Sequence, residues 1–441
     1  ADLRINARWT ITMNGNRASA LENQAVFISN GRILAVESQP DTQLQATETL
    51  DLPDHILLPG YINAHGHAAM SLFRGLADDL PLLPWLEQRI WPLEHAHDEA
   101  STRLSARLTF AELLRSGTTT VQTMESVRHA EVTAEIALRS GLTVITGNCL
   151  MDVATAAMPA GMATTATAAL AATDALRRAF HGRGRLAIAV APRFVLSCSE
   201  ELARDAAAYA EQHGLRLHSH AAEHPDEVAA VRSRFGRDYL EVLHDQGLLG
   251  PRTALAHCVH LSPHERELLV ATDTAVLHCP STNLKLGSGI AAVAELDARG
   301  VRLALGADGA PCNNRLSMPT ELRQAALLQS LVAGPGAWPA ARALWTATRG
   351  GALALGLHDV GQLAPGCRAD LVLWSLGDPL LGGEPAARIV YGATERHIDR
   401  VVLGGEVVDL TADATDGELG ELAAAVDMTL PAVLARAGLA R

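Results

Sequence analysis

Eight short apolar runs alternate with helical stretches through the middle of the chain, and this alternation constrains the fold more than any other feature. The strand-then-helix order favours a parallel sheet covered by helices. Eight such units at roughly 30 residues each fit a (β/α)8 barrel of about 250 residues. A doubly wound sheet is the alternative, but no G-x-G-x-x-G fingerprint follows an early strand. The runs are Ile56–Asn63, Thr118–Met124, Thr143–Leu150, Leu186–Phe194, Leu215–His220, Thr253–His257, Ala275–Cys279 and Arg302–Ala307.

The two ends of the chain have a different pattern, typical of antiparallel strands. Two alternating runs flank Asn30-Gly31, a dipeptide that favours a tight hairpin, and Gly404-Gly405 has the same setting near the other end. Both ends therefore contribute to one small β domain. We predict a β-sandwich built from residues 1–56 and 362–441, the second part carrying a terminal helix, around an α/β barrel domain at residues 57–361.

Composition narrows the possible partners and the compartment. The 441 residues carry a net charge of −13, which disfavours nucleic acid and anionic membranes as partners. No window of about 18 uninterrupted apolar residues predicts a membrane helix, and the N-terminus has no apolar signal core. The six cysteines lie far apart and read as free thiols. We expect a cytoplasmic protein that binds a small molecule.

Two histidines, His65 and His67, stand one residue apart at the end of the first run. Residues two apart on a strand point to the same side. Barrel enzymes keep their active sites at the carboxyl ends of the strands. A pair of imidazoles there suits Zn²⁺ or a similar metal. Without further evidence, the two histidines could equally well be ordinary polar residues of a loop that bind no metal.

Other strand ends carry residues of the same chemical kind. The fifth run ends with His218, His220 and Glu223, the sixth is followed by His257 and His260, and the eighth by Asp308. Because these ends meet at one mouth of a barrel, the side chains should cluster. Three histidines and a carboxylate would supply four protein ligands, with water as a fifth. That count differs from the three-ligand pattern of catalytic zinc.

Five motifs together resemble the amidohydrolase superfamily, in its mononuclear deaminase and chlorohydrolase branch, over essentially the whole chain. They are LPGYINAHGH, HAAE, LAHCVHL, HCPSTNLKLGSG and LGADGAPCNN.

This resemblance implies one divalent metal on His65, His67, His220 and Asp308. It makes Glu223 the proton shuttle, sets His257 against the metal-bound water and lets Asp308 accept the water's proton. Zn²⁺ is expected, with Fe²⁺ or Mn²⁺ as alternatives. Lys285 is the only lysine and follows the seventh run, which excludes a two-metal site bridged by a lysine at the fourth strand end.

The stretch from Ser71 to Glu94 is similar to the 5′-methylthioadenosine/S-adenosylhomocysteine deaminases. The resemblance implies that Glu94 holds the ribose hydroxyls and that Trp85 covers the base. Without it, Glu94 reads as a helix surface charge and Trp85 as a core residue.

The fourth run ends with Arg193 in APRF, which looks like guanine deaminase and also like the 5′-deoxyadenosine deaminases. Arg193 would donate to a ring carbonyl or nitrogen. Asn148 stands where users of S-adenosylhomocysteine carry an arginine. We therefore expect an adenosine-type deaminase that accepts a small or absent 5′ substituent.

Rival functions share this metal site. Deamination of guanine, another oxopurine or a pterin is one, and an s-triazine chlorohydrolase is another. A non-catalytic binding protein of the same fold would be expected to lose Glu223 or a metal ligand, and the chain keeps them all. The resemblance also implies a homo-oligomer, a dimer or tetramer. The segment at residues 71–97 is a candidate lid.

Overall fold

The computed structural model describes residues 1–375, 377–378 and 381–440, and these form two compact units. The terminal unit comprises Ala1–Asn63, Glu112–Thr120 and Ser317–Gly417. The central unit comprises Ala64–Ala111, Val121–Leu316 and Glu418–Arg441. The domain limits predicted from the sequence divide the chain differently and stay a prediction.

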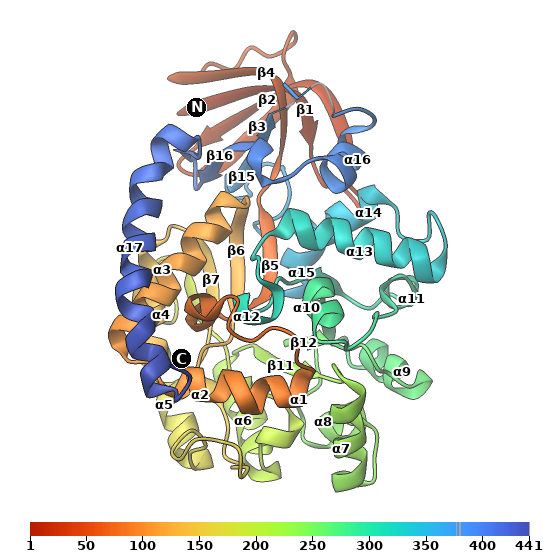
Figure 1. Ribbon diagram of the computed structural model, residues 1–441. Helices are drawn as coiled ribbons and strands as arrows, with labels where there is room; N and C mark the ends of the chain where they lie inside the picture. Colours follow the sequence, from red (N-terminus) through yellow and green to blue (C-terminus); the bar gives the residue numbers. More distant parts are fainter. Residues whose placement is uncertain (376, 379–380, 441) are drawn as a thin grey trace. The chain divides into compact units, whose positions relative to one another are not determined.

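The terminal unit contains a seven-stranded sheet to which both ends of the chain contribute. In Figure 1 the red strands of the N-terminal part and the blue strands of the C-terminal part lie in this sheet. Strands β1 and β4 pair in parallel, and β1–β2, β2–β3, β4–β15, β15–β16 and β16–β17 pair antiparallel. In sheet order the strands are β17 (Glu406–Asp409), β16 (Ile398–Leu403), β15 (Leu371–Ser375), β4 (Glu48–Pro59), β1 (Leu3–Ile11), β2 (Ala20–Ser29) and β3 (Arg32–Ser38).

Both predicted hairpin turns are confirmed. Asn30 and Gly31 have φ values of 50° and 73°, and Gly404 and Gly405 have 57° and 87°. Two successive positive φ values are typical of the tight turn that joins twisted antiparallel strands. A Cβ atom on Gly31 would lie 2.7 Å from the carbonyl oxygen of Gly404, so the two turns touch and leave no space for a side chain there.

Two four-stranded sheets contain the strands predicted in the middle of the chain. Each of the eight apolar runs overlaps one of these strands, although the first run, Ile56–Asn63, is divided between the end of β4 and the start of β5. The pairs β7–β9, β11–β12, β12–β13 and β13–β14 are parallel. The sheets are β5 (Tyr61–Gly66), β6 (Thr118–Thr123), β7 (Thr143–Thr146) and β9 (Leu186–Ile188), and β11 (Leu217–Ala221), β12 (Thr253–His257), β13 (Ala275–His278) and β14 (Leu303–Leu305).

The third and fourth runs each break into two strands. The second pieces, β8 (Cys149–Leu150) and β10 (Ala191–Pro192), pair with each other in parallel. Isolated parallel bridges at Gly66–Asp308 and Val190–Leu217 join the edges of the two four-stranded sheets. The ladders themselves give two sheets, so the structure carries the predicted order of parallel strands without one continuous eight-stranded ladder.

Helices follow the parallel strands in the predicted alternation, and local signals set their ends. The Ser262 hydroxyl accepts from the Glu265 backbone N–H at the start of α9, and Gly214 ends α6 with a φ of 63°. Within the described residues, no helix is long and apolar enough to cross a membrane. The helices are α1 (Leu82–Trp85), α2 (Trp91–His95), α3 (Glu99–Arg115), α4 (Ala130–Arg139), α5 (Ala166–Phe180), α6 (Glu200–His213), α7 (Pro225–Phe235), α8 (Tyr239–Asp245), α9 (Pro263–Ala271), α10 (Pro280–Lys285), α11 (Val293–Ala298), α12 (Ala310–Asn313), α13 (Met318–Ala333), α14 (Ala340–Trp345), α15 (Gly351–Ala354), α16 (Pro385–Ala387) and α17 (Ala412–Arg436).

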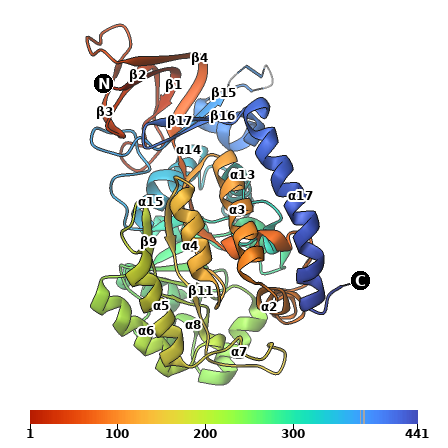
Figure 2. The ribbon, with the colours of Figure 1, turned by 90° about the vertical axis from the view of Figure 1, so that its left-hand side faces the viewer.

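The end of α17 packs beside α2 in the central unit (Figure 2). Arg436 donates from Nε to the Ala96 carbonyl at 2.7 Å and pairs with the Asp98 carboxylate at 3.1 Å. Leu422 and Val433 are buried in the same apolar cluster as the residues of the candidate lid. The C-terminal helix therefore fixes the segment at residues 71–97 from outside.

Gly60 separates β4 from β5 at a point where no side chain fits. A Cβ atom there would lie 2.2 Å from both Cγ2 and Oγ1 of the buried Thr119. We expect Gly60→Ala to lower the free energy of unfolding by roughly 1–3 kcal/mol through overpacking, measured as a fall in melting temperature. Gly250→Ala is the matched control, because nothing lies within 4 Å of a Cβ atom there. Equal melting temperatures for the two variants would contradict the close approach at Gly60.

Candidate active site

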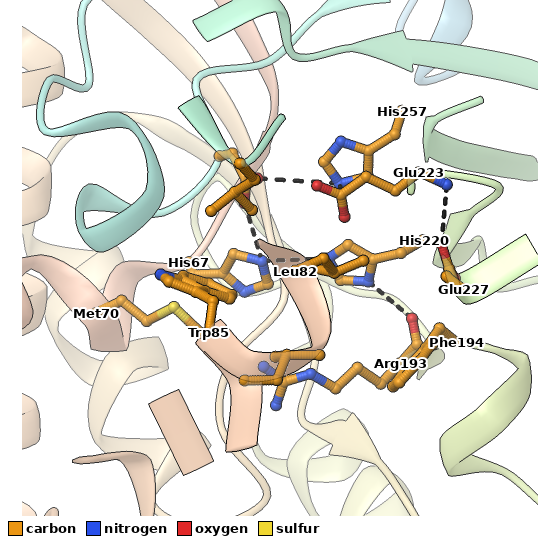
Figure 3. Close-up of a pocket in the computed structure, with 13 residues that line it drawn as sticks. His67, Met70, Leu82, Trp85, Arg193, Phe194, His220, Glu223, Glu227 and His257 are labelled. Carbon is orange, nitrogen blue, oxygen red and sulfur yellow. Dashed lines mark hydrogen bonds and ion pairs between the residues drawn. The ribbon is translucent and has the colours of Figure 1, made fainter. Parts of the chain in front are cut away.

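Four ligand-type side chains converge at the carboxyl ends of the parallel strands, as the sequence predicts. His65 lies on β5, His67 directly follows it, His220 lies on β11 and Asp308 follows β14. One ligand atom from each lies within 4.8 Å of the other three. Asp308 Oδ1 is 3.3 Å from His65 Nε2 and 3.2 Å from His67 Nε2, which is 3.3 Å from His220 Nε2. Figure 3 shows the His67 and His220 rings facing each other across this centre.

Each imidazole of the cluster is oriented by its other ring nitrogen. His67 Nδ1 donates to the Met124 carbonyl and His220 Nδ1 to the Arg193 carbonyl, both at 2.7 Å. A carbonyl only accepts, so the proton sits on Nδ1 and the Nε2 lone pair faces the centre. His65 Nδ1 lies 2.8 Å from His218 Nε2, which makes His218 a contact of this ligand.

The donor set fits a divalent metal. His65 Nε2 is fully buried and has no hydrogen-bond partner among the described residues, as expected for a nitrogen that points at a ligand site. Zinc–nitrogen distances of about 2.0–2.1 Å place neighbouring ligand atoms roughly 3–4 Å apart, and the pairs His65–Asp308, His67–Asp308 and His67–His220 lie 3.2–3.3 Å apart. Lys285 lies outside the cluster, where its Nζ donates to the Pro311 carbonyl and to Asn314 Oδ1.

Burial and the Asp308 carboxylate together set the protonation states of the cluster. At His67 burial opposes the charged form, but the hydrogen bond and charge of Asp308 raise the pKa above its ordinary value. Burial lowers the pKa of His65 to about 4 and that of His220 well below its ordinary value. Burial opposes ionisation of Asp308, but His65 and His67 together hold its pKa well below the usual range. At neutral pH two neutral imidazoles and one ionised carboxylate therefore face the centre, the forms in which these groups bind metals.

Glu223 and His257 lie beside the four ligands. His257 Nε2 is 3.4 Å from Glu223 Oε2 and 3.9 Å from Asp308 Oδ2. Burial raises the pKa of Glu223 well above its ordinary value, and the negative charges of Asp308 and Glu227 raise it further. A carboxyl group in this setting keeps its proton to a higher pH than a free glutamic acid does and can donate it.

The backbone around these side chains adopts an uncommon conformation. Ala222, His257 and Asp308 have φ values of 48°, 73° and 62°, in the left-handed region that few residues other than glycine adopt. Such backbone strain gathers at functional sites, where the surrounding packing enforces it.

A hollow opens over the cluster, and it encloses about 420 Å³ of empty space when the open solvent at its mouth is included. It brings together the predicted Trp85 and Arg193 with Glu223, His257 and three of the four ligands (Figure 3). The lining residues are His67, Met70, Leu82, Trp85, Leu86, Arg193, Phe194, His220, Glu223, Glu227, His257, Leu286 and Asp308.

Glu94 is not among the residues that line this hollow; it lies behind Arg193. Its Oε2 is 2.7 Å from Arg193 Nη1, and its Oε1 accepts from the Ser126 hydroxyl at 3.2 Å. Burial opposes the charge of Arg193, but Glu94 raises the pKa of the guanidinium above its ordinary value. Glu94 and Arg193, both predicted to bind substrate, thus form one buried ion pair with each other. That either of them touches a substrate stays a prediction.

Several wall residues have no role in the sequence analysis. Leu82 and Leu86 share a helical face with Trp85, so the i, i+3, i+4 spacing was a usable signal. Met70 follows His67 by three residues, and Leu286 lies within the HCPSTNLKLGSG motif. Phe194, next to Arg193, carries no distinguishing pattern.

Comparison with known proteins places these observations in one family. The profile of the amidohydrolase family matches residues 56–408. A 5-methylthioadenosine/S-adenosylhomocysteine deaminase of Desulfitobacterium hafniense is 36% identical over 390 residues, which cover 87% of this chain and 88% of that protein. A 5′-deoxyadenosine deaminase of Methanothermobacter thermautotrophicus is 36% identical over 407 residues, 91% of this chain and 92% of that protein. The crystal structure of an adenosine deaminase from Xanthomonas campestris with bound zinc is 32% identical, covers 97% of this chain and 99% of its own, and gives a TM-score of 0.88.

If the four side chains hold one ion, removal of a single ligand should release it. We expect the wild-type protein to bind one equivalent of zinc and His67→Asn to lose affinity by more than the roughly 10–100-fold seen when only an outer partner is removed. Metal analysis and chelator competition measure this. His264→Asn, a histidine more than half exposed and outside the cluster, should match the wild type. Two equivalents in the wild type, or full occupancy in His67→Asn, would contradict the assignment.

Proposed function

The chain belongs to the amidohydrolase family, as a hydrolase acting on carbon–nitrogen bonds, and we propose that it deaminates an adenosine-type nucleoside such as 5′-deoxyadenosine or 5′-methylthioadenosine. The 6-amino group becomes a 6-oxo group and ammonia leaves. The observation that carries the proposal is one hollow that joins the buried cluster of ligands to a carboxyl group with a raised pKa. The names of the relatives support the same reaction.

We propose that His65, His67, His220 and Asp308 hold a single divalent ion. Zn²⁺ is favoured by three imidazole nitrogens with one carboxylate and by the zinc in the Xanthomonas enzyme. Fe²⁺ and Mn²⁺ are the alternatives. When bound, the ion supplies the Lewis acidity that activates water for attack at neutral pH.

The protein's own groups then move the protons. Asp308, ionised in the cluster, accepts the proton that water loses as its oxygen bonds to the ring carbon. Glu223 donates its proton to the adjacent ring nitrogen and then helps to deliver a proton to the departing amine. His257 orients the attacking oxygen and stabilises the tetrahedral centre. The carbon–oxygen bond forms, the carbon–nitrogen bond breaks, and the ring becomes an oxopurine. Acid–base catalysis of this kind contributes roughly 10²–10⁴ in rate.

The pocket walls favour a purine with a small 5′ group. Trp85 offers an aromatic face and Arg193 offers donors for a ring nitrogen or carbonyl, within the same hollow. Asn148, at the strand end where users of S-adenosylhomocysteine carry an arginine, is buried and accepts from the Thr173 hydroxyl at 2.8 Å. We propose that Glu94 reaches the ribose hydroxyls only when a bound nucleoside turns the Glu94–Arg193 pair toward the hollow, because in this structure Glu94 pairs with Arg193 and does not line the hollow.

Guanine or another oxopurine is the second candidate substrate. Arg193 favours it, because a guanidinium that faces the pocket matches a ring carbonyl as well as it matches a ring nitrogen. Both candidates use the same ligands and the same acid.

We also propose a closed (β/α)8 barrel, a β-sandwich of the two chain ends, and a homo-oligomer in the cytoplasm. The edge bridges Gly66–Asp308 and Val190–Leu217 support closure of the barrel. Exposed Leu327, Leu331 and Val332 on α13 support self-association through an apolar surface. The six cysteines are all buried free thiols, which fits a reducing compartment.

Ammonia release from the metal-loaded protein tests the function. We expect turnover of 5′-deoxyadenosine, 5′-methylthioadenosine and adenosine to exceed that of guanine, because Glu94 can accept the ribose hydroxyls. Glu94→Gln should reduce nucleoside turnover and leave a base substrate nearly unaffected. Because Glu94→Gln keeps the size of the side chain but leaves the buried Arg193 guanidinium without its charged partner, which costs about 3–5 kcal/mol of stability, the melting temperature of the variant is measured beside its turnover. Turnover of guanine alone would favour the second candidate. If none of the four compounds released ammonia, the nucleoside proposal would be wrong, and triazines and pterins would be the substrates to test next.

Glu223→Gln tests the proposed acid. Glutamine keeps the size of the side chain but has no proton to donate, so we expect kcat to fall by about 10²–10⁴ while the metal content stays at the wild-type level. Steady-state kinetics and metal analysis of the same preparation measure this. Near-normal turnover would remove Glu223 from the mechanism.

A further inference from the structure

We propose that α10 and the turn after it position both proton-handling side chains: Asn283 orients His257, and Ser288 orients Glu223. Neither Asn283 nor Ser288 lines the hollow, so both act through the side chains that they touch. The inference rests on the proposed function, because it deepens the roles of Glu223 and His257 in that reaction.

Ser288 fixes one oxygen of the catalytic carboxyl group. Its hydroxyl donates to Glu223 Oε1 at 3.2 Å, and both residues are buried. The other oxygen, Oε2, lies 3.4 Å from His257 Nε2. The hydrogen bond to Oε1 therefore holds the carboxyl group in the rotation that keeps Oε2 beside His257. Ser288 is itself held, because its carbonyl accepts from His260 Nε2 at 2.6 Å.

Asn283 fixes the ring of His257 and its tautomer. Asn283 Oδ1 lies 2.9 Å from His257 Nδ1. An amide oxygen only accepts, so the ring proton sits on Nδ1 and the Nε2 lone pair faces Glu223 and Asp308. Among the described residues His257 Nε2 is buried without a hydrogen-bond partner, which leaves it free to accept from an attacking oxygen.

The segment that carries both residues is anchored from outside. Lys285, the only lysine of the chain, donates from Nζ to the Pro311 carbonyl at 3.0 Å and to Asn314 Oδ1 at 2.9 Å, and it pairs with Asp78. These contacts join the loop after β13 to the loops after β5 and β14, so α10 is braced against its neighbours at the mouth of the site.

The turn after α10 packs tightly against the loop that follows β12. Gly289 has a φ of 124°, and its N–H donates to the Asn283 carbonyl at 3.2 Å. A Cβ atom on Gly289 would lie 3.3 Å from Val259 Cγ1 and 3.5 Å from His260 Cε1. The turn thus ties Asn283 and Ser288 into one unit.

This arrangement predicts an effect on chemistry rather than on substrate binding. Ser288→Ala should lower kcat about 10–100-fold, because small misplacements of a reacting group cost up to about 10²-fold. KM should stay within about twofold of the wild-type value, since Ser288 does not line the hollow. Ser288→Thr, which restores a hydroxyl, should recover most of the lost kcat.

The matched control is Ser116→Ala, which removes a buried hydroxyl that donates to the Leu113 carbonyl at 2.9 Å. It should keep both kinetic constants. Melting temperature and zinc content should be the same in Ser288→Ala, Ser116→Ala and the wild type. The inference would be overturned if Ser288→Ala showed a lower kcat together with a higher KM and a lower melting temperature, and if Ser288→Thr did not restore kcat. Ser288 would then contribute only to packing.

A crystal structure of zinc-loaded Ser288→Ala gives a readout that needs no turnover. We expect the Glu223 carboxyl group to rotate away from His257 or to occupy more than one orientation. An unmoved carboxyl group would overturn the inference. If the wild-type protein released no ammonia from any nucleoside, the proposed function would fail, and the position of Glu223 in this crystal would still decide the role of Ser288.

Discussion

Two buried imidazoles, one half-buried imidazole and one buried carboxylate face one another at the carboxyl ends of β5, β11 and β14, and the rest of the site depends on how these four groups are satisfied. An unpaired charge in a dry interior is strongly unfavourable, so such a cluster persists only with a positive ion or with mutual pairing at its centre. The acceptors that orient the rings lie on neighbouring segments, at the Met124 and Arg193 carbonyls. The strands must therefore be aligned before the ligands are, which ties the metal site to the fold.

The same packing shifts the pKa values of the two carboxyl groups in opposite directions. Asp308 lies between imidazoles that hold its pKa low, whereas Glu223 lies in a buried setting beside other acids that hold its pKa high. Two carboxyl groups whose pKa values differ in this way can supply a base and an acid at the same pH. Arg193 connects this centre to the substrate side, because its carbonyl orients His220 while its guanidinium pairs with Glu94.

Sequence reasoning worked where a local pattern determines the structure. The apolar runs predicted the parallel strands because strand length and flanking turn residues are local, and His65, His67 and Asp308 could be placed because strand ends converge in such folds. It did not foresee that the third and fourth runs would break, with β8 and β10 pairing together, because that depends on partners far along the chain. The Glu94–Arg193 pair joins positions 99 residues apart, and no periodicity signals it. Ser288 lies in the HCPSTNLKLGSG motif, but its proposed role depends on a contact with Glu223 that only the folded chain provides.

Anomalous diffraction from crystals of the zinc-loaded protein, collected at the zinc absorption edge, tests whether one metal ion lies at these strand ends. We expect a single anomalous peak per chain, bounded by the Nε2 atoms of His65, His67 and His220 and by the Asp308 carboxylate. Two peaks in this cluster, or one peak at another place, would contradict a single catalytic metal at these strand ends and the proton-transfer roles derived from it.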